Sequence, residues 1–242
     1  MQGTRSSRGR VPVSAWDNGT GAKIALSCAI CHIRKEKRFC PALHDRICPQ
    51  CCGTEREVTL DCPSECVYLQ QARRHERPRT LEELDRAALF PDVEVPEEFL
   101  YEREPLIVGL SFVVAKAARA DPSVRDRDVI AALSSVGKSY ATLVSSGLVY
   151  EPPTANVPQQ ALAAELQKSI AEYREAEQQH IGYATLKDAD ALRALVFLLR
   201  LAYSRTSGRP RSRAFIDFVL EQFPAKESVI ATSQETSRII MP

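Results

Sequence analysis

The sequence is poor in glycine and lacks long apolar runs. Its ten glycines are few for 242 residues, which argues against a glycine-punctuated all-β fold or a nucleotide-binding α/β fold. The first 21 residues hold no apolar core of a secretory signal. The most apolar stretches, 106–115 and 194–202, are shorter than the roughly 20 residues that a membrane crossing needs. We therefore expect a cytoplasmic protein without a membrane partner.

A net charge is almost absent, at +1, but the charges are unevenly distributed. Residues 1–80 carry 14 Lys and Arg against 8 Asp and Glu, whereas residues 81–242 carry 18 against 23. With 44% hydrophobic residues, the chain has the composition of a folded protein. We expect a disordered basic tail, a Cys-rich module, a helical region and a polar tail, over residues 1–21, 22–78, 80–224 and 225–242.

Cysteine is missing from residue 67 onward, because all eight cysteines lie between residues 28 and 66. In a reducing compartment, clustered thiols are metal ligands more often than disulfides. All-Cys sites are closed and structural, whereas catalytic zinc keeps an open position for water. The sequence therefore predicts two structural Zn²⁺ ions, with these ligands: Cys28, Cys31, Cys40, Cys48, Cys51, Cys52, Cys62 and Cys66.

The spacing of Cys48 and Cys51 is typical of a zinc knuckle, because two thiolates from one turn reach a single ion. Residues 55–61 alternate between apolar and polar side chains and predict a short strand. Asp61 then predicts the start of a helix with Cys62 and Cys66 on one face. This order resembles the treble-clef class of zinc modules over residues 48–75. The resemblance implies a structural zinc with four ligands: Cys48, Cys51, Cys62 and Cys66.

Two pairings of the cysteines fit the spacing. In the first pairing, the treble-clef set leaves a second set of four: Cys28, Cys31, Cys40 and Cys52. His44 or His32 could substitute for one ligand of this second set. In a cross-braced pairing, the Cys28/Cys31 and Cys48/Cys51 pairs share one ion, which leaves the other set: Cys40, Cys52, Cys62 and Cys66. The isolated Cys40 departs from the pair spacings of RING and MYND fingers, so neither family is assigned.

Basic side chains flank the cysteines in the sequence and make nucleic-acid phosphates a candidate partner. They lie in two segments of the Cys-rich module: Arg34, Lys35, Lys37, Arg38, Arg73 and Arg74. No recognition-helix signature is visible, so such contact would involve the phosphate backbone or the overall shape rather than the bases. The alternative is that these charges solubilise the module and that its partner is a protein.

From residue 80 onward, the sequence predicts a mainly α-helical protein, an antiparallel bundle that follows the short strands and single helix of the Cys-rich module. Apolar residues recur at helical spacing, and Pro, Gly and capping residues mark the helix ends. We expect an irregular acidic stretch over 92–104 and helices that begin at Thr80, Pro105, Ser123, Asn156, Asp188 and Pro210. The bundle is also where a protein contact or a homo-oligomer would form.

Three arginines near the end of the bundle are unusual. Arg209, Arg211 and Arg213 would lie in the first turn of a helix, where cations face the positive end of the helix dipole. A bound phosphate would offset this repulsion. Alternatively, the arginines point into water or pair with acids such as Glu151 or Asp190.

Little else in the helical region indicates catalysis. His180 is the only histidine of the helical region. Glu177 and His180 have the Glu-x-x-His spacing of a di-iron site, but such a site needs a second Glu-x-x-His motif, which the helical region lacks. We therefore interpret Glu177 as part of a solvated helix face. We expect a non-enzymatic zinc-binding adaptor or regulatory protein whose Cys-rich module contacts nucleic acid or a partner protein. The alternative is an enzyme or sensor that binds a phosphorylated ligand through the arginine-rich helix N-terminus.

Overall fold

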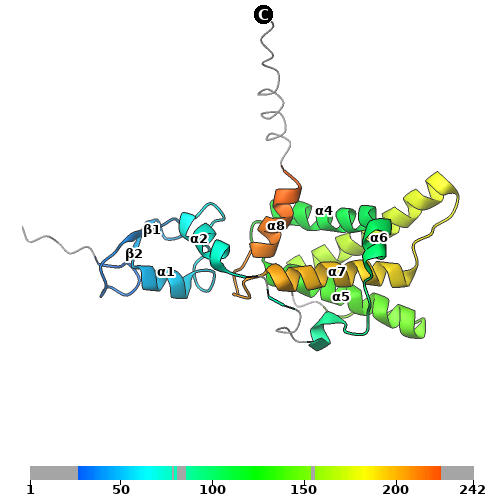
Figure 1. The fold of residues 1–242 in the computed structure, drawn as a ribbon, viewed down its shortest axis with the longest axis horizontal. Helices are drawn as coiled ribbons and strands as arrows, with labels where there is room; N and C mark the ends of the chain where they lie inside the picture. Colours follow the sequence, from blue (N-terminus) through cyan, green and yellow to red (C-terminus); the bar gives the residue numbers. More distant parts are fainter. Residues whose placement is uncertain (1–26, 78, 81–85, 154–155, 225–242) are drawn as a thin grey trace, which may run out of the picture.

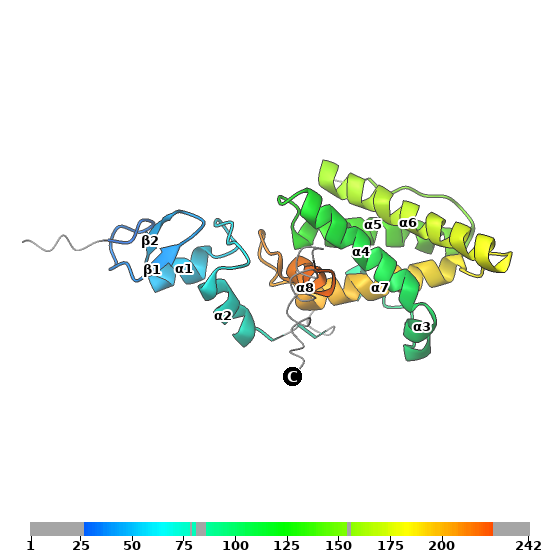
Figure 2. The ribbon, with the colours of Figure 1, turned by 90° about the horizontal axis from the view of Figure 1, so that it is seen from above.

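The computed structural model describes a small Cys-rich part and a larger helical part, over residues 27–77, 79–80, 86–153 and 156–224. We call residues 27–77 the Cys module and residues 86–224 the helical bundle. The two parts lie end to end, with the strands of the Cys module farthest from the bundle (Figures 1 and 2). The predicted tails, 1–21 and 225–242, lie outside the described residues.

The Cys module contains one hairpin and two helices. Strands β1 (Arg38–Cys40) and β2 (Asp45–Ile47) pair antiparallel, with Cys40 opposite Asp45. Helix α1 (Pro49–Glu55) follows the hairpin directly, and α2 (Val67–His75) leads toward the bundle. The core of this module is small and consists largely of cysteine: Cys28, Cys40, Ile47, Cys48, Cys51, Cys52 and Leu60. Short strands are therefore confirmed, but the module has two helices where one was expected.

Two local predictions for the Cys module are wrong. The segment 55–61 is not a strand: Glu55 ends α1, and a turn over 57–59 follows, with a single isolated bridge between Arg56 and Leu60. The apolar alternation was misleading because Glu57 is the buried side chain and Val58 is 38% exposed. The next helix begins at Val67 rather than Asp61. Tertiary contacts of Glu57 and of the 61–66 loop, described below, override the local pattern.

The helical bundle contains a short 3₁₀ helix and six α-helices in the described residues: η2 (Arg86–Leu89), α3 (Glu97–Glu102), α4 (Glu104–Ala120), α5 (Asp126–Ser146), α6 (Val157–Ile181), α7 (Asp188–Arg205) and α8 (Ala214–Gln222). Helix α5 packs on α6 and α7, and α4 packs on α6 and α8. The shared core includes Leu110, Leu133, Leu166 and Leu195, all fully buried. The expected fold class, mainly α with a helical bundle, is confirmed.

Several helix ends follow the chemistry that the sequence indicates. The side chain of Asn156 accepts a hydrogen bond from the N–H of Gln159 at 2.9 Å and caps α6. Gly147 and Gly182 end α5 and α6 with φ of 71° and 85°, a left-handed conformation that glycine adopts without strain.

Other boundaries differ from the prediction. The first turn of the helix predicted from Thr80 falls in residues 81–85, which lie outside the described residues; η2 follows them. The acidic stretch 92–104, expected to be irregular, contains α3. The last helix begins at Ala214 rather than Pro210, so residues 209–213 form a loop before it. No helix among the described residues combines the length and apolarity that a membrane span requires.

Candidate metal centre

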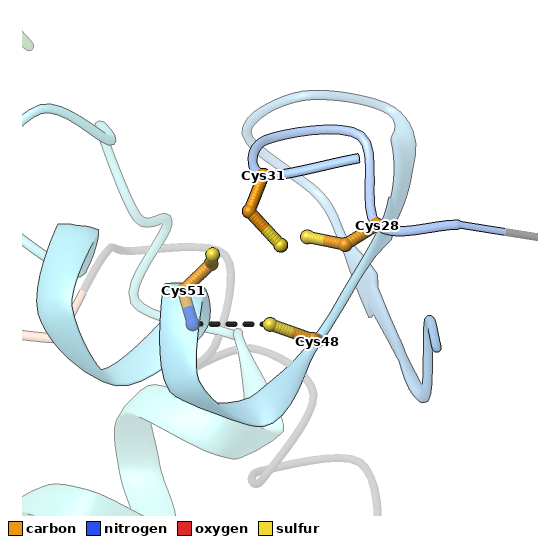
Figure 3. A group of neighbouring side chains, drawn as sticks. All are labelled: Cys28, Cys31, Cys48 and Cys51. Carbon is orange, nitrogen blue, oxygen red and sulfur yellow. Dashed lines mark hydrogen bonds between the residues drawn. The ribbon is translucent and has the colours of Figure 1, made fainter. Parts of the chain in front are cut away.

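Four cysteine sulfurs converge in the Cys module. The Sγ atoms of Cys28, Cys31, Cys48 and Cys51 all lie within 4.8 Å of one another (Figure 3). In a tetrahedral site with Zn–S bonds of about 2.3 Å, the sulfurs are about 3.8 Å apart. The cluster is therefore within metal-binding distance and consistent with a zinc-binding module. No other group of metal-ligating side chains is this tight in the part of the chain that the structure describes.

The local fold explains how two distant pairs meet. A tight turn holds Cys28 and Cys31, in which the N–H of His32 donates to the carbonyl of Cys28 at 2.8 Å. The N–H of Ala29 donates to the carbonyl of Arg46 at 3.0 Å, which fixes this turn beside β2. Strand β2 then leads into α1, so the first pair lies against the start of that helix.

The second pair lies in the first turn of α1. Cys48 is the N-cap of this helix, and its sulfur accepts a hydrogen bond from the N–H of Cys51 at 3.4 Å (Figure 3). Pro49 occupies the first helical position, where its missing N–H costs nothing. The exposed N–H groups at a helix N-terminus favour the thiolate form of a ligand placed there.

The cluster does not accommodate four thiolates without a cation. Backbone N–H groups of Arg34 and Ile33 lower the pKa of Cys31 to about 6. Burial raises the pKa of Cys28, but N–H groups that include that of Cys31 outweigh it and the net shift is downward. Burial and the neighbouring sulfurs raise the pKa of Cys51 to about 12. A divalent cation would replace the retained protons and allow all four sulfurs to ionise.

Arg34 supplies a positive charge beside this cluster. Desolvation lowers the pKa of Arg34, but its hydrogen bonds to the sulfurs of Cys48 and Cys31 raise it by more. A zinc ion with four thiolates carries a net negative charge, which a guanidinium at this position would offset. Arg34 therefore belongs to the surroundings of the metal centre rather than only to an outer basic surface.

The other four cysteines face one small cavity. Cys40, Cys52, Cys62 and Cys66 line a space of about 10 Å³, together with Ile47, Leu60 and Leu69. This volume is about that of one water-sized probe. Burial raises the pKa of Cys62, and the nearby thiols of Cys66 and Cys40 raise it further. These sulfurs are less tightly grouped than the first four.

The structure decides between the two pairings. Cys48 and Cys51 group with Cys28 and Cys31, so the predicted set in which they join Cys62 and Cys66 is wrong. The order expected for residues 48–75 was a knuckle, one short strand and a helix N-terminus. A Cys turn, a two-stranded hairpin and a helix N-terminus occur instead at residues 28–55. His32 and His44, the proposed substitute ligands, are exposed and have left-handed backbone conformations in turns. Neither belongs to the tight four-sulfur group.

The predicted basic residues of the Cys module have different surroundings. Lys35, Lys37 and Arg74 are exposed. The guanidinium carbon of Arg38 lies 4.6 Å from the ring centroid of Tyr68, in cation–π geometry. The guanidinium of Arg73 forms ion pairs with Glu57 at 2.9 Å and Asp217 at 2.6 Å. Arg73 therefore connects the module to the bundle.

The three arginines before α8 also have protein partners. The guanidinium of Arg209 donates to the carbonyls of Gly53 and Arg56 at the end of α1, at 3.0 and 2.5 Å. The guanidinium of Arg213 donates to the carbonyls of Val124 and Ala118, at 2.6 and 3.4 Å. The last carbonyls of a helix attract cations, so Arg209 and Arg213 lie in favourable electrostatic positions.

Arg211 completes this group through an acidic partner. Its guanidinium pairs with Asp61, which also accepts from Arg125 at 2.8 Å. Burial raises the pKa of Asp61, but these two guanidinium groups lower it by more. The partners suggested from the sequence, Glu151 and Asp190, are therefore not the observed ones.

The N-terminus of α8 is capped from within the protein. The carboxylate of Asp126, 1% exposed, accepts from the N–H groups of Phe215 and Ile216 at 3.2 and 3.1 Å. The hydroxyl of Ser212 donates to the same carboxylate at 2.7 Å. Asp126 thus occupies the position at which the sequence suggested a bound anion.

Glu57 is the functional residue that the sequence analysis missed. Its carboxylate, 2% exposed, accepts from Arg73 and from the hydroxyl of Ser207, both at 2.9 Å. Its backbone carbonyl accepts from the N–H of Arg211 at 2.9 Å. The sequence contains only an indirect signal for this role of Glu57. Several arginines lack acidic partners nearby in the sequence, which implies that an acidic acceptor lies elsewhere in the chain.

No known protein family, curated protein or solved structure matches this chain. The fold and the site together define a helical-bundle protein with a Cys-rich module whose four-cysteine cluster is consistent with zinc binding. The function beyond this is inferred from the chemistry of the site.

Proposed function

We propose that this chain is a non-enzymatic, zinc-stabilised adaptor or regulatory protein. The observation that supports this most directly is the cluster of Cys28, Cys31, Cys48 and Cys51. Four sulfur ligands fill a tetrahedral zinc site and leave no position for water or substrate, which is typical of structural zinc. The small core of the module gives such an ion a stabilising role.

We also propose a second structural zinc ion, held by the other four cysteines. Cys40, Cys52, Cys62 and Cys66 share one small cavity, and three of them are buried. Elemental analysis of the purified protein should give two zinc ions per chain. One zinc ion per chain would contradict the second site, and an absence of zinc would contradict the proposed function.

The tip of the Cys module is the candidate surface for a partner. Lys35 and Lys37 are exposed near the hairpin, and Phe39 is 51% exposed beside them in sequence. The hairpin lies at the end of the molecule farthest from the bundle (Figure 1). Cationic and aromatic side chains together suit a nucleic-acid backbone and its bases, whereas exposed apolar side chains suit a protein.

Gel shifts with generic RNA and duplex DNA distinguish these two partners. If the tip binds nucleic acid, the shift should weaken steeply with salt and disappear in the double variant Lys35→Gln, Lys37→Gln. The matched control removes two exposed charges from the bundle, Lys138→Gln and Lys168→Gln, and should bind normally. The absence of a shift at low salt would leave a protein as the partner class.

The bundle has its own candidate surface for protein contacts or self-association. Leu148, Val149 and Tyr150 are consecutive residues after the end of α5, with exposed fractions of 66%, 85% and 46%. Exposed apolar side chains that gather in one place often mark an interaction site. Sedimentation of the wild type and of a Leu148→Ser, Val149→Ser variant tests this role. A smaller mass for the variant than for the wild type would support self-association through this segment, and equal masses would contradict it.

A phosphate-binding enzyme or sensor has narrower support. Arg209, Arg211 and Arg213 contact protein carbonyls and carboxylates instead of an open helix N-terminus. A cleft of about 480 Å³ nevertheless lies at the junction of module and bundle, lined by five arginines and three acids: Arg73, Arg77, Arg79, Arg205, Arg209, Glu76, Asp217 and Glu221. A thermal shift with millimolar inorganic phosphate, absent with chloride at equal ionic strength, would support this alternative.

A further inference from the structure

The contacts between the Cys module and the bundle are concentrated around one of the two cysteine sets. On the module side, hydrogen bonds and ion pairs to the bundle involve residues 53–73: Gly53, Arg56, Glu57, Asp61, Ser64 and Arg73. The Cys28–Cys31 turn and the β1–β2 hairpin lie at the distal end of the molecule (Figure 1). The Cys28–Cys31 half of the first cysteine set is therefore separate from the junction, whereas Cys51 lies two residues before Gly53 in α1.

The second cysteine set is interleaved with the junction residues along the chain. Asp61 directly precedes Cys62, and it pairs with Arg125 and Arg211 of the bundle. Ser64 lies between Cys62 and Cys66, and its hydroxyl donates to Asp217 of α8 at 2.8 Å. The loop that carries two of the four sulfurs is thus the same loop that contacts the bundle.

Glu57 lies between the two features. It stands in the turn between α1 and Cys62, and its carboxylate contacts Arg73 and Ser207. The backbone of Glu57 is left-handed, with φ of 55°, an uncommon conformation for a residue other than glycine, asparagine or aspartate. Several contacts must therefore cooperate to hold Glu57 in place.

We propose that metal binding by Cys40, Cys52, Cys62 and Cys66 controls the docking of the Cys module against the bundle. This inference rests on the second zinc ion proposed above. A bound ion fixes the positions of the 61–66 loop and of the Glu57 turn, and so prearranges the acceptors for Arg73, Arg125 and Arg211. Without the ion, buried sulfurs repel or protonate, the loop loses its fixed geometry, and the junction opens.

The bundle side of the junction is shaped to receive this loop. The N–H of Arg211 donates to the carbonyl of Glu57, and Gly208, with φ of 72°, packs so closely on the Arg79 guanidinium that any side chain would collide with it. The backbone N–H of Arg79 donates to the carbonyl of Ser204 at 3.1 Å. The connection between module and bundle is therefore itself seated on the end of α7, beside the same junction.

Amide hydrogen exchange at Arg211 reports docking from the bundle side. In the full chain, Cys62→Ser should lose one zinc ion and accelerate exchange at Arg211 by about tenfold or more, because one structural hydrogen bond opens. Small-angle scattering should show a larger radius of gyration. Cys31→Ser, in the first set, should also lose one ion but leave exchange at Arg211 and the radius of gyration unchanged.

A second variant separates loss of metal from general misfolding. Cys62→His keeps a zinc ligand at a half-buried position and should restore both the second ion and slow exchange at Arg211. Fast exchange in Cys62→His despite two bound ions would overturn the inference, as would normal docking in Cys62→Ser after loss of one ion. A single zinc ion in the wild type would instead contradict the second site itself.

Discussion

At the scale of single residues, the charge beside the four-sulfur cluster determines how tightly a metal ion is held. Both Arg34 and Lys35 are exposed, but interactions with the sulfurs of Cys48 and Cys31 raise the pKa of Arg34 above its ordinary value. Groups that contact metal ligands typically change metal affinity by 10–100-fold when removed. The position of a cation relative to the sulfurs therefore matters more than the total charge of the segment.

We predict that Arg34→Ala weakens zinc binding at the first site by about tenfold or more, because the thiolates lose a charged donor. Competition with a chromophoric chelator measures this affinity. Lys35→Ala is the matched control, since it removes the same charge from the next residue and should leave the affinity within about twofold of wild type. Equal losses in both variants would show that only the general field of the segment matters.

The sequence identified the ligand type but not the ligand pairing. Spacing predicted that Cys48 and Cys51 belong to one site, because both fit in one turn of chain, and the structure groups their sulfurs. Their partners depend on the β1–β2 hairpin, which places the Cys28 turn beside the start of α1. That hairpin is only three residues long on each side, too short to give a clear alternating pattern. The pairing therefore became evident only from the three-dimensional path.

At the scale of secondary-structure elements, buried carboxylates determine where helices begin and how they connect. Asp126 begins α5 and also caps α8 through two backbone N–H groups. Glu177 in α6 accepts from the N–H groups of Thr185 and Leu186 at 2.7 and 2.8 Å, and from Arg103 at 3.0 Å. The interpretation of Glu177 as a solvated residue is therefore wrong, because its partners lie in loops that helical periodicity does not describe.

We predict that Asp126→Ala lowers the free energy of unfolding of the bundle by about 2–3 kcal/mol, since it leaves buried N–H groups without a charged acceptor. Urea unfolding monitored by circular dichroism measures the change. Glu165→Ala is the control, because its pair with Lys116 at 3.5 Å is exposed and should contribute less than about 1 kcal/mol. A similar loss in both variants would argue against the capping role of Asp126.

Glu177 makes the bundle sensitive to acid. Burial raises the pKa of Glu177, but hydrogen bonds from Thr185 and Leu186 outweigh it and lower the pKa below its ordinary value. The native state therefore favours the carboxylate, and this stabilisation is present above the ordinary glutamate pKa of about 4.3 and is lost as the pH falls through the lower native value.

We accordingly predict that Glu177→Gln destabilises the bundle by about 1–3 kcal/mol at pH 7, and that the difference from wild type shrinks below about pH 4. Urea unfolding at pH 7 and at pH 3.5 tests both parts. The neighbouring Glu175 is exposed, so Glu175→Gln should have little effect at either pH. A difference that is independent of pH would show that Glu177 acts through packing alone.

At the scale of the whole molecule, several contacts of the junction have a polarity opposite to the net charges of the two parts. The basic N-terminal part supplies acids, Glu57 and Asp61, whereas the acidic helical part supplies Arg125 and Arg211. The pair of Arg73 with Asp217 has the polarity that the net charges suggest, whereas the pairs of Asp61 with Arg125 and Arg211 have the opposite polarity. Docking depends on a few buried partners, and overall composition gives no information about them.

The two parts also differ in what holds them together. The bundle has an extensive apolar core shared by α4, α5, α6 and α7, whereas most buried side chains of the Cys module are cysteines. A core of this kind contributes little hydrophobic stabilisation, because its sulfurs are also potential thiolates. The module should therefore depend on bound metal for its stability, whereas the bundle should not.

We predict that exhaustive chelation under reducing conditions unfolds the Cys module and leaves the bundle folded. Hydrogen exchange should accelerate throughout β1, β2 and α1, while α5 and α7 stay protected because their core, with Leu133 and Leu195 fully buried, contains no metal ligand. Added zinc should restore protection in the module and cadmium should do the same, since both ions accept four thiolates. Persistent protection of α1 after complete removal of metal would show that the module folds without an ion, and loss of protection in α5 would show that the two parts unfold as one.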